Sequence, residues 1–281
     1  EVTATDGHVL DGQVSTLNYN GGTSAGSVVV LRDVTRFKQL DEMKSDFVAN
    51  VSHDLRSPLT QMLTYSQLIP MDGPLTENQV KWLSRVERAV VDMKDLIEVL
   101  LDLNRLESGV TLVTVPFRVE EIFRSIVEDF KDEAATNGVT IKYETEEFLP
   151  VVDGDVDLIK QAIRNIVSNA IKYAPNSGDL ILNAKSKGDF VNISVSDQGP
   201  GIAESDVARV FEKFYRVESQ GNGKISGRGL GLALVKSIAE RHGGKAWCES
   251  QLAVGSRFYL SLPINNIGQK NIRKGNLKQP V

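Results

Sequence analysis

The sequence predicts an all-α helical hairpin followed by an α+β sandwich, and three observations lead to this prediction. Residues 36–108 carry apolar residues at helical spacing in two long segments, which are separated by the turn "PMDGPL". After residue 109, short β-like runs alternate with shorter helical segments, a pattern typical of helices packed over one mixed sheet. The length of 281 residues, of which 41% are hydrophobic and 25% charged, is enough for about two domains.

Residues 1–35 precede the hairpin and differ from it in pattern. They alternate short β-like runs around a turn at Gly21 and Gly22, which predicts a β-hairpin too small to fold alone. We interpret this segment as the C-terminal fragment of a larger domain. At the other end, residues 264–281 are polar and basic without periodicity, and we expect them to form a disordered tail.

The two long helices, expected over residues 36–69 and 76–108, each carry one apolar face. On the second helix the apolar residues are spaced alternately three and four apart, which is a heptad seam. One hairpin covers only one face of each helix, so we expect two copies to pair into a four-helix bundle. The alternative is a bundle completed by other parts of the same chain. The faces comprise Leu40, Met43, Phe47, Val51, Leu55, Pro58 and Met62 on the first helix, and Leu83, Val86, Val90, Met93, Ile97 and Leu100 on the second.

The segment from residue 109 to residue 263 is expected to form the sandwich. Its apolar runs and turn residues separate strands from helices. The expected strands cover 111–117, 139–146, 179–187, 190–199, 245–250 and 256–263, and the expected helices cover 119–136, 156–173 and 229–241.

Composition limits the partners and the compartment. A net charge of −5 offers no broad basic field for duplex nucleic acid, so no nucleic-acid partner is expected. The single cysteine, Cys248, excludes an internal disulfide and is interpreted as a small apolar residue of a strand. No stretch approaches the length of a membrane span, so we expect a cytoplasmic segment without membrane contact. The first residue is not methionine, which leaves room for a membrane anchor upstream.

The stretch "NVSHDLRSPL", residues 50–59, places a histidine beside an acid on the first helix. His53 projects roughly 150° away from the mean direction of the apolar face and is expected to face solvent. A neutral imidazole in such a place can act as a nucleophile, and Asp54 can orient it and accept its proton. Taken alone the signal is weak, because an exposed histidine on a helix is inert in most proteins.

Four stretches of the sandwich together predict a nucleotide site. In "RNIVSNAIKYAP", Asn165 and Asn169 share one helical face, and their amide oxygens can complete the shell of a Mg²⁺ ion that bridges phosphates. Lys172 adds positive charge and Tyr173 a flat surface. In "SVSDQGPGI", Asp197 ends a strand and is a natural acceptor for the amino group of adenine.

The other two stretches are rich in glycine. "SGRGLGLALVKSI" runs three glycines into a helix, whose N-terminal amides can hold phosphate. Between the glycine motifs, "VFEKFYRVESQGNGKISGR" is flexible and basic and can close over a nucleotide. Each glycine motif alone is more often a tight turn, but the four stretches in this order favour a nucleotide site.

The chain resembles the transmitter region of sensor histidine kinases. The resemblance rests on the H box "FVANVSHDLRSPL", the N box "RNIVSNAIKY", the glycine boxes "DQGPGI" and "GRGLGL" and the F box "FEKFYR", and it covers residues 37–263. It implies an all-α dimerisation and phosphotransfer hairpin over 36–108 and an α+β Bergerat-type ATP-binding sandwich over 109–263. Residues 1–35, which end in "DVT", resemble the last strands of a PAS sensor domain.

The resemblance also implies the chemistry. ATP, with Mg²⁺, would give its γ-phosphate to His53, assisted by Asp54, and the phosphate would pass to an aspartate of a response regulator. Asn169 would bind the Mg²⁺ and Asp197 the adenine. The other implied residues of the ATP pocket are Asn165, Lys172, Tyr173, Gly199, Gly201, Ile202, Phe211, Lys213, Arg216, Arg228, Gly229, Leu230 and Gly231.

Two departures from the family pattern qualify these roles. Arg228 stands where the family usually has threonine or serine, and Ser57 stands where phosphatase-competent members usually have threonine or asparagine. We therefore expect weak phosphatase activity toward the regulator at most. Two alternatives are less favoured. An ATP-hydrolysing clamp of the gyrase, Hsp90 and MutL type uses a glutamate as its base where this chain has Asn165, and an asparagine cannot act as that base. A dimeric scaffold that binds nucleotide without phosphorylating anything is disfavoured by the intact His53, Asp54 and Asn169.

Overall fold

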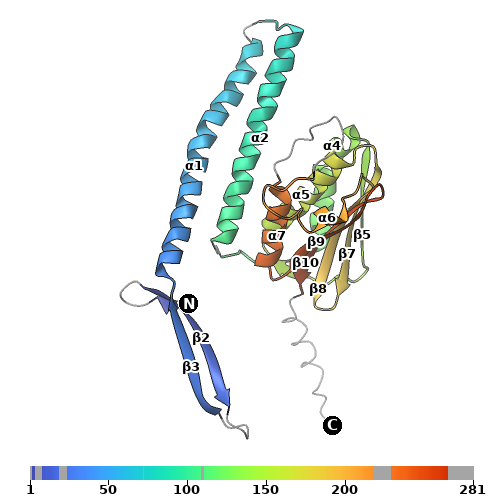
Figure 1. Cartoon of the computed structure of the whole chain (residues 1–281). Helices are drawn as coiled ribbons and strands as arrows, with labels where there is room; N and C mark the ends of the chain where they lie inside the picture. The colour runs from blue at the N-terminus through green and yellow to red at the C-terminus, as the bar shows by residue number, and fades with distance from the viewer. Residues whose placement is uncertain are drawn as a thin grey trace, which may run out of the picture. The chain divides into compact units, whose positions relative to one another are not determined.

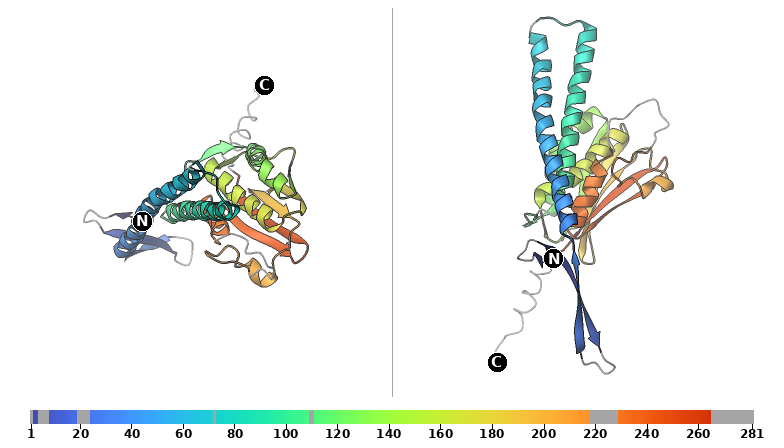
Figure 2. Two further views of the ribbon diagram at one scale, coloured as in Figure 1. Left: turned by 90° about the horizontal axis from the view of Figure 1, so that it is seen from above. Right: turned by 60° about the vertical axis from the view of Figure 1, so that its left-hand side comes forward.

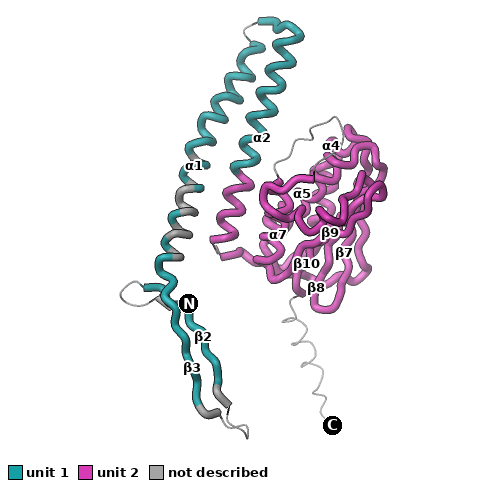
Figure 3. The backbone as a smooth tube through the Cα atoms, in the orientation of Figure 1, with its two compact units in different colours: residues 1–97 teal, residues 98–281 magenta. Residues whose placement is uncertain are grey.

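A computed structural model describes residues 2–3, 8–18, 24–71, 73–108, 111–217 and 229–264. The chain divides into two compact units, residues 1–97 and residues 98–281 (Figure 3). Helix α2 begins in the first unit and ends in the second.

The first unit consists of a small sheet and most of the helical hairpin. Strands β1 (Val2–Thr3), β2 (Val9–Asn18) and β3 (Ser24–Asp33) form an antiparallel sheet in that order. Helix α1 (Thr35–Leu68) ends in a 3₁₀ turn, η1 (Ile69–Met71), and α2 (Glu77–Glu107) returns alongside it (Figure 2). Among the described residues, no helix combines the length and the apolarity needed to cross a bilayer.

A capping box fixes the start of α2. The Thr76 backbone N–H donates to Gln79 Oε1 at 2.8 Å, and the Gln79 backbone N–H donates to Thr76 Oγ1 at 3.3 Å. These reciprocal bonds satisfy two N–H groups that the first turn of a helix leaves without partners, which stabilises the helix by about 1 kcal/mol. The predicted bounds of both long helices agree with those of α1 and α2 to within about one residue.

The hairpin buries only part of its apolar surface. Leu59 of α1 and Val90 and Ile97 of α2 are buried, whereas Val86 and Met93 of the same seam are exposed. Val51, Leu55 and Met62 of the predicted α1 face are exposed as well. A row of exposed apolar residues along both helices leaves a surface that a second hairpin can cover.

The second unit is a two-layer sandwich around a five-stranded sheet (Figure 1). The strand order is β5-β7-β8-β10-β9, in which only β5 and β7 are parallel. The elements are β4 (Val115–Phe117), α3 (Val119–Asp129), α4 (Lys131–Thr136), β5 (Val139–Thr145), β6 (Val152–Gly154), α5 (Val156–Tyr173), β7 (Gly178–Lys187), β8 (Phe190–Asp197), α6 (Glu204–Val207), α7 (Gly231–Arg241), β9 (Lys245–Gln251) and β10 (Gly255–Pro263).

Helices α3, α5 and α7 contact one face of the sheet and form the core with it. Alternate strand residues point into this layer, as their burial along β7, β8 and β10 shows. Complete burial of each large aliphatic side chain contributes about 1.5–3 kcal/mol to folding. Fully buried members include Ile159, Ile163, Ile166, Leu180, Leu182, Ile193, Leu234, Ile238 and Leu260.

Several local features of the second unit differ from the sequence prediction. The helix expected over 119–136 is divided at Phe130, which has φ −104° and ψ 4° and a buried ring beneath the Arg164 guanidinium. The strand expected over 111–117 is reduced to β4. Strand β6 and helix α6 were not predicted, because three or four residues are too few to show a period.

Cys248 in β9 is buried, and we predict that it is chemically inert in the folded protein. Burial raises the pKa of its thiol to about 12, and the thiolate is the reactive species. At pH 8 a chromogenic disulfide reagent should therefore react slowly with the native chain and release one equivalent of chromophore after unfolding. Rapid release from native protein would contradict this prediction.

Candidate functional site

Helix α5 carries the asparagine motif and is firmly anchored at its start. The Asp155 side chain caps it by accepting the Leu158 N–H at 3.3 Å, and the Asp155 N–H donates to His242 Nε2 at 3.0 Å. Asn165 and Asn169 are half-buried at the edge of the apolar face of the helix. Their amides are therefore held by a rigid element and still reachable from solvent.

Two close approaches bring both glycine motifs to α5. A Cβ added at Gly231, the first residue of α7, would lie 3.4 Å from Asn165 Oδ1. A Cβ added at Gly199 would lie 2.7 Å from the Cβ of Ala174, the residue that follows α5. The start of α7 and the loop after β8 thus lie against the C-terminal half of the asparagine helix, as the predicted nucleotide site requires.

Asp197 is the last residue of β8, and its carboxylate is tied to the backbone. Oδ1 accepts the Gly199 N–H at 2.9 Å and the Ser256 N–H at 3.3 Å. Burial raises the pKa of the Asp197 carboxyl above its usual value, and these N–H bonds oppose the rise without cancelling it. A fixed, half-buried carboxylate of this kind is suited to accept a hydrogen bond from a ligand.

Gly201 and Gly229 occupy positions that exclude any side chain. Both have φ 71°, in the left-handed region. A Cβ at Gly201 would lie 2.0 Å from the Gln251 carbonyl oxygen, and one at Gly229 would lie 2.5 Å from the Tyr215 carbonyl oxygen. The family resemblance places both glycines in the ATP pocket, and close backbone packing alone already requires glycine at each position.

The F-box residues have mixed surroundings. The Phe211 ring packs edge-on against Phe258 of β10, with centroids 6.4 Å apart, so it contributes to the core. Lys213 forms an ion pair with Glu107 near the end of α2. The Phe214 N–H donates to the Gly229 carbonyl oxygen at 2.9 Å. Residues 218–228, which belong to the segment expected to close over a nucleotide, lie outside the described part of the structure.

The structure describes most of the remaining predicted site residues. Lys172, Tyr173 and Arg216 are exposed, Ile202 is half-buried, and Leu230 is buried where α7 begins. Asp54 and Ser57 are exposed on α1. The backbone of His53 lies in α1, whereas its side chain and the whole of Arg228 lie outside the described part of the structure.

Sequence reasoning missed the residues of β9 and β10 that surround Asp197. Ser256 pairs with Asp197 across the β8–β10 ladder and is buried. A Cβ at Gly255 would lie 2.1 Å from the Asp197 carbonyl oxygen. No motif marks these residues, because their role follows from strands 59 positions apart lying side by side.

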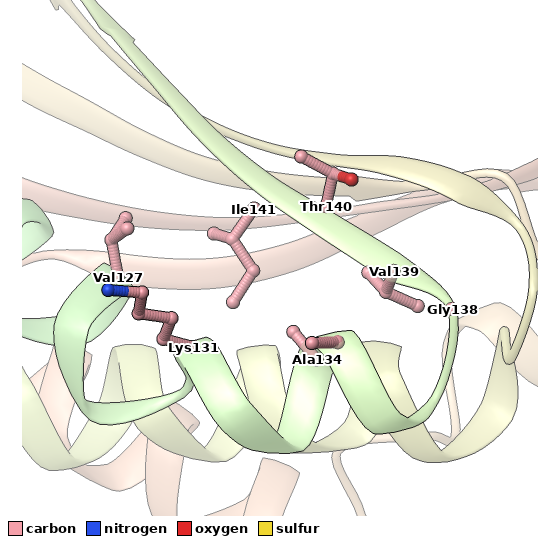
Figure 4. A pocket seen from close by; sticks show the side chains of 8 residues that line it. Val127, Lys131, Ala134, Gly138, Val139, Thr140 and Ile141 are labelled. Atoms are coloured by element: carbon pink, nitrogen blue, oxygen red, sulfur yellow. The ribbon is translucent and has the colours of Figure 1, made fainter.

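A shallow depression lies elsewhere on the sandwich, between α3, α4 and the edge strand β5 (Figure 4). Its volume is about 460 Å³, and apolar side chains dominate its lining. Its lining contains none of the predicted site residues. The lining residues are Val127, Lys131, Ala134, Ala135, Gly138, Val139, Thr140 and Ile141.

The residues at the asparagine helix fit a nucleotide with its metal better than a free metal ion. Among the described residues, no three or more histidine, cysteine, aspartate or glutamate side chains form a cluster that could hold a metal. A Mg²⁺ ion at the Asn169 amide would therefore need phosphate oxygens and water to fill its shell, which is how Mg²⁺ is usually bound with nucleotides.

A sandwich with this site, in a chain that also carries a helical hairpin with a His-Asp pair, is typical of protein histidine kinases. Comparison with known families agrees. Residues 154–266 match the family described as "Histidine kinase-, DNA gyrase B-, and HSP90-like ATPase", and residues 43–109 match the "His Kinase A (phospho-acceptor) domain". The chain therefore carries the transmitter region of a sensor histidine kinase and belongs to that family.

Known proteins with similar sequence include named sensor kinases. The chain is 35% identical over 243 residues to the sensor-like histidine kinase SenX3 of Mycolicibacterium smegmatis, covering 84% of this chain and 62% of SenX3. It is 32% identical over 263 residues to the sensor histidine kinase WalK of Bacillus subtilis, covering 91% of this chain and 42% of WalK. The chain thus spans less than two thirds of the length of either relative.

Solved structures give the same fold. Full-length ShkA in complex with AMPPNP superimposes with a TM-score of 0.65 at 27% identity, covering 78% of this chain and 45% of ShkA. The Acinetobacter baumannii histidine kinase AdeS superimposes with a TM-score of 0.55 at 24% identity, covering 76% of this chain and 98% of that structure, and supports the fold alone.

Proposed function

We propose that this chain is an ATP-dependent histidine kinase that phosphorylates His53 and passes the phosphate to an aspartate of a response regulator. The observation that carries the proposal is the convergence of Asn165, Gly199 and Gly231 at the C-terminal half of α5. In the proposed reaction a ring nitrogen of His53 attacks the γ-phosphorus, the bond to the β-γ bridging oxygen breaks and ADP leaves. Asp54 accepts the proton that the ring releases.

The nucleotide would be held by groups of three kinds. The Asp197 carboxylate would accept a hydrogen bond from the adenine amino group. The N-terminal amides of α7 would face the phosphates, where the helix dipole favours negative charge. The Asn169 amide would contribute to the Mg²⁺ shell, and bound Mg²⁺ neutralises charge on the phosphates. The further residues predicted for the pocket from the sequence remain part of this proposal.

Incubation with γ-labelled ATP and Mg²⁺ tests the proposed function. We expect label on the protein that acid removes and base does not, as phosphohistidine requires. Label that survives acid would assign the phosphate to another residue. Release of labelled phosphate without any labelled protein would instead support an ATP-hydrolysing clamp.

The domain organisation is also proposed from the sequence. Residues 1–35 would be a PAS-like fragment, 36–108 the dimerisation and phosphotransfer hairpin, 109–263 the ATP-binding domain and 264–281 a tail. We place this segment in the cytoplasm, with a response-regulator receiver domain as its partner. The exposed Ser57 hydroxyl lies one helical turn beyond His53 and would support weak removal of phosphate from the regulator.

We predict that the hairpin forms a homodimer through the exposed half of its seam. Light scattering should give the full chain twice its monomer mass, and Val86→Glu should shift it toward monomer, because a charge would be buried at the bundle centre. Val91→Glu is the matched control. Val91 lies on the same helix outside the seam, and it is 44% exposed, against 49% for Val86. Equal masses for the two variants would contradict pairing through the seam.

A further inference from the structure

Three residues form a row across the sheet at the proposed adenine site. Asp197 ends β8, Ser256 lies opposite it on β10, and Ser250 of β9 lies opposite Ser256. Asp197 is bonded to its neighbour in the row through the Ser256 N–H. The outermost residue, Ser250, belongs to no motif of the sequence and has no role in the function proposed above.

The Ser250 hydroxyl joins three backbone segments. Its Oγ accepts the Ile202 N–H at 2.8 Å, donates to the Gly255 carbonyl oxygen at 2.9 Å, and lies 2.9 Å from Ser256 Oγ. A hydroxyl has one proton and two lone pairs. With its own proton directed at Gly255, it accepts from Ile202 and from the Ser256 hydroxyl, so its hydrogen-bonding capacity is fully used.

These bonds fasten the β9–β10 turn to the loop after Asp197. The Ala253 N–H donates to the Pro200 carbonyl oxygen at 2.8 Å, next to the Ile202–Ser250 bond. The close packing of Gly201 on Gln251, and of Gly255 on the Asp197 carbonyl, leaves little room for either segment to shift. The position of the Asp197 carboxylate therefore depends on how the turn is held.

We propose that Ser250 is a positioning residue for purine recognition: it fixes the Asp197 carboxylate and thereby sets the preference for adenine over guanine. The inference rests on the proposed function, in which Asp197 accepts the adenine amino group. Guanine carries a carbonyl oxygen at that position, which a fixed carboxylate repels. A carboxylate that can move aside repels it less, so loss of the Ser250 bonds weakens ATP binding and also the discrimination against GTP.

The test measures the dissociation constants of ATP and GTP for the full chain, by displacement of a fluorescent nucleotide. Ser250→Ala leaves the Ile202 N–H and the Gly255 carbonyl without this partner. A displaced Asp197 carboxylate loses the equivalent of one hydrogen bond to the adenine amino group, which corresponds to about fivefold weaker ATP binding. We expect a smaller change for GTP, so that the ratio of the two constants falls severalfold. Ser250→Thr keeps the hydroxyl and should keep the wild-type ratio.

Ser261→Ala is the matched control. Ser261 lies at the other end of the same strand pair, where its hydroxyl accepts the Lys245 N–H at 2.9 Å and donates to the Lys245 carbonyl oxygen at 3.2 Å. The substitution removes two bonds to backbone groups from the same two strands. It should lower the melting temperature as Ser250→Ala does, while the ratio of ATP to GTP affinity stays that of the wild type.

The outcomes separate this inference from the function on which it rests. A wild-type chain that binds neither nucleotide overturns both. The role of Ser250 alone is overturned if the wild-type chain prefers ATP and Ser250→Ala keeps the same preference. It is overturned as well if Ser261→Ala loses as much of that preference as Ser250→Ala does. If Ser250→Ala does not fold, Ser250→Cys takes its place, because a thiol is a weaker donor and acceptor. An unchanged ratio in Ser250→Cys then overturns the inference.

Discussion

His53→Ala is expected to abolish phosphorylation of the chain while its affinity for ATP stays within about twofold of the wild type. His53 lies in α1, in the first compact unit, whereas all residues proposed to contact the nucleotide lie in the second. Removing the imidazole removes the acceptor nitrogen without touching the pocket. Retention of γ-label after gel separation and displacement of a fluorescent nucleotide measure the two quantities.

The other two histidines of the chain provide comparisons for this test. His242 is buried, and both of its ring nitrogens are engaged: Nε2 accepts the Asp155 N–H at 3.0 Å, and Nδ1 lies 2.7 Å from the Ile238 carbonyl oxygen, to which it donates. A ring held in this way has no nitrogen available to attack phosphorus.

His8 is exposed in the first unit, with Nδ1 3.0 Å from Asp33 Oδ2. His8→Ala is therefore the matched control and should label as the wild type does. Label that persists in His53→Ala, or that disappears in His8→Ala, would show that the acceptor has been assigned wrongly.

The sequence predicted the long elements well because their periodicity is strong. Eighteen residues of α5 show one continuous apolar stripe, and the helix was expected over the range that it occupies. The heptad seam and the capping box likewise define α2 locally. The break at Phe130 was not predictable, because no glycine or proline marks it and its cause is the burial of one ring in the tertiary fold.

The sequence indicated the motifs of the candidate site but not the contacts between its residues. The sequence could select Asn165 and Asp197, because their side chains suit a nucleotide site. It could also select Gly231, because the absence of a side chain suits such a site. Ser250 and Ser256 could not be selected, because serine in a strand is common and carries no signal. Their positions depend on the pairing of β10 with both β8 and β9, which the order of the elements along the chain does not reveal.

Asp197→Asn is expected to weaken ATP binding about 100-fold, because a hydrogen bond to a charged group is replaced by a repulsive contact. The Gly199 and Ser256 N–H groups both donate to Oδ1, and the carbonyl oxygen of asparagine can keep these two bonds. Its amide NH₂ then faces the adenine amino group, donor against donor. GTP, which presents a carbonyl at that position, should lose less affinity than ATP.

The raised pKa of Asp197 adds a pH dependence with a defined sign. Protonation removes the acceptor, so ATP affinity should fall as pH decreases, beginning at a higher pH than for an ordinary aspartate. For the nucleotide-free chain, the folded state holds this proton more tightly than the unfolded state. This carboxyl therefore makes the free energy of unfolding decrease as pH rises through its folded pKa.

Calorimetric titrations with ATP over a range of pH, on the wild type and on Asp197→Asn, separate this effect from the titration of ATP itself. The phosphates titrate alike in both experiments, so the difference between the two curves belongs to the carboxyl. We expect that difference to be large at neutral pH and to shrink as the medium becomes acidic. A constant difference across the range, or equal ATP affinity for the two proteins at neutral pH, would show that ionised Asp197 does not recognise the base.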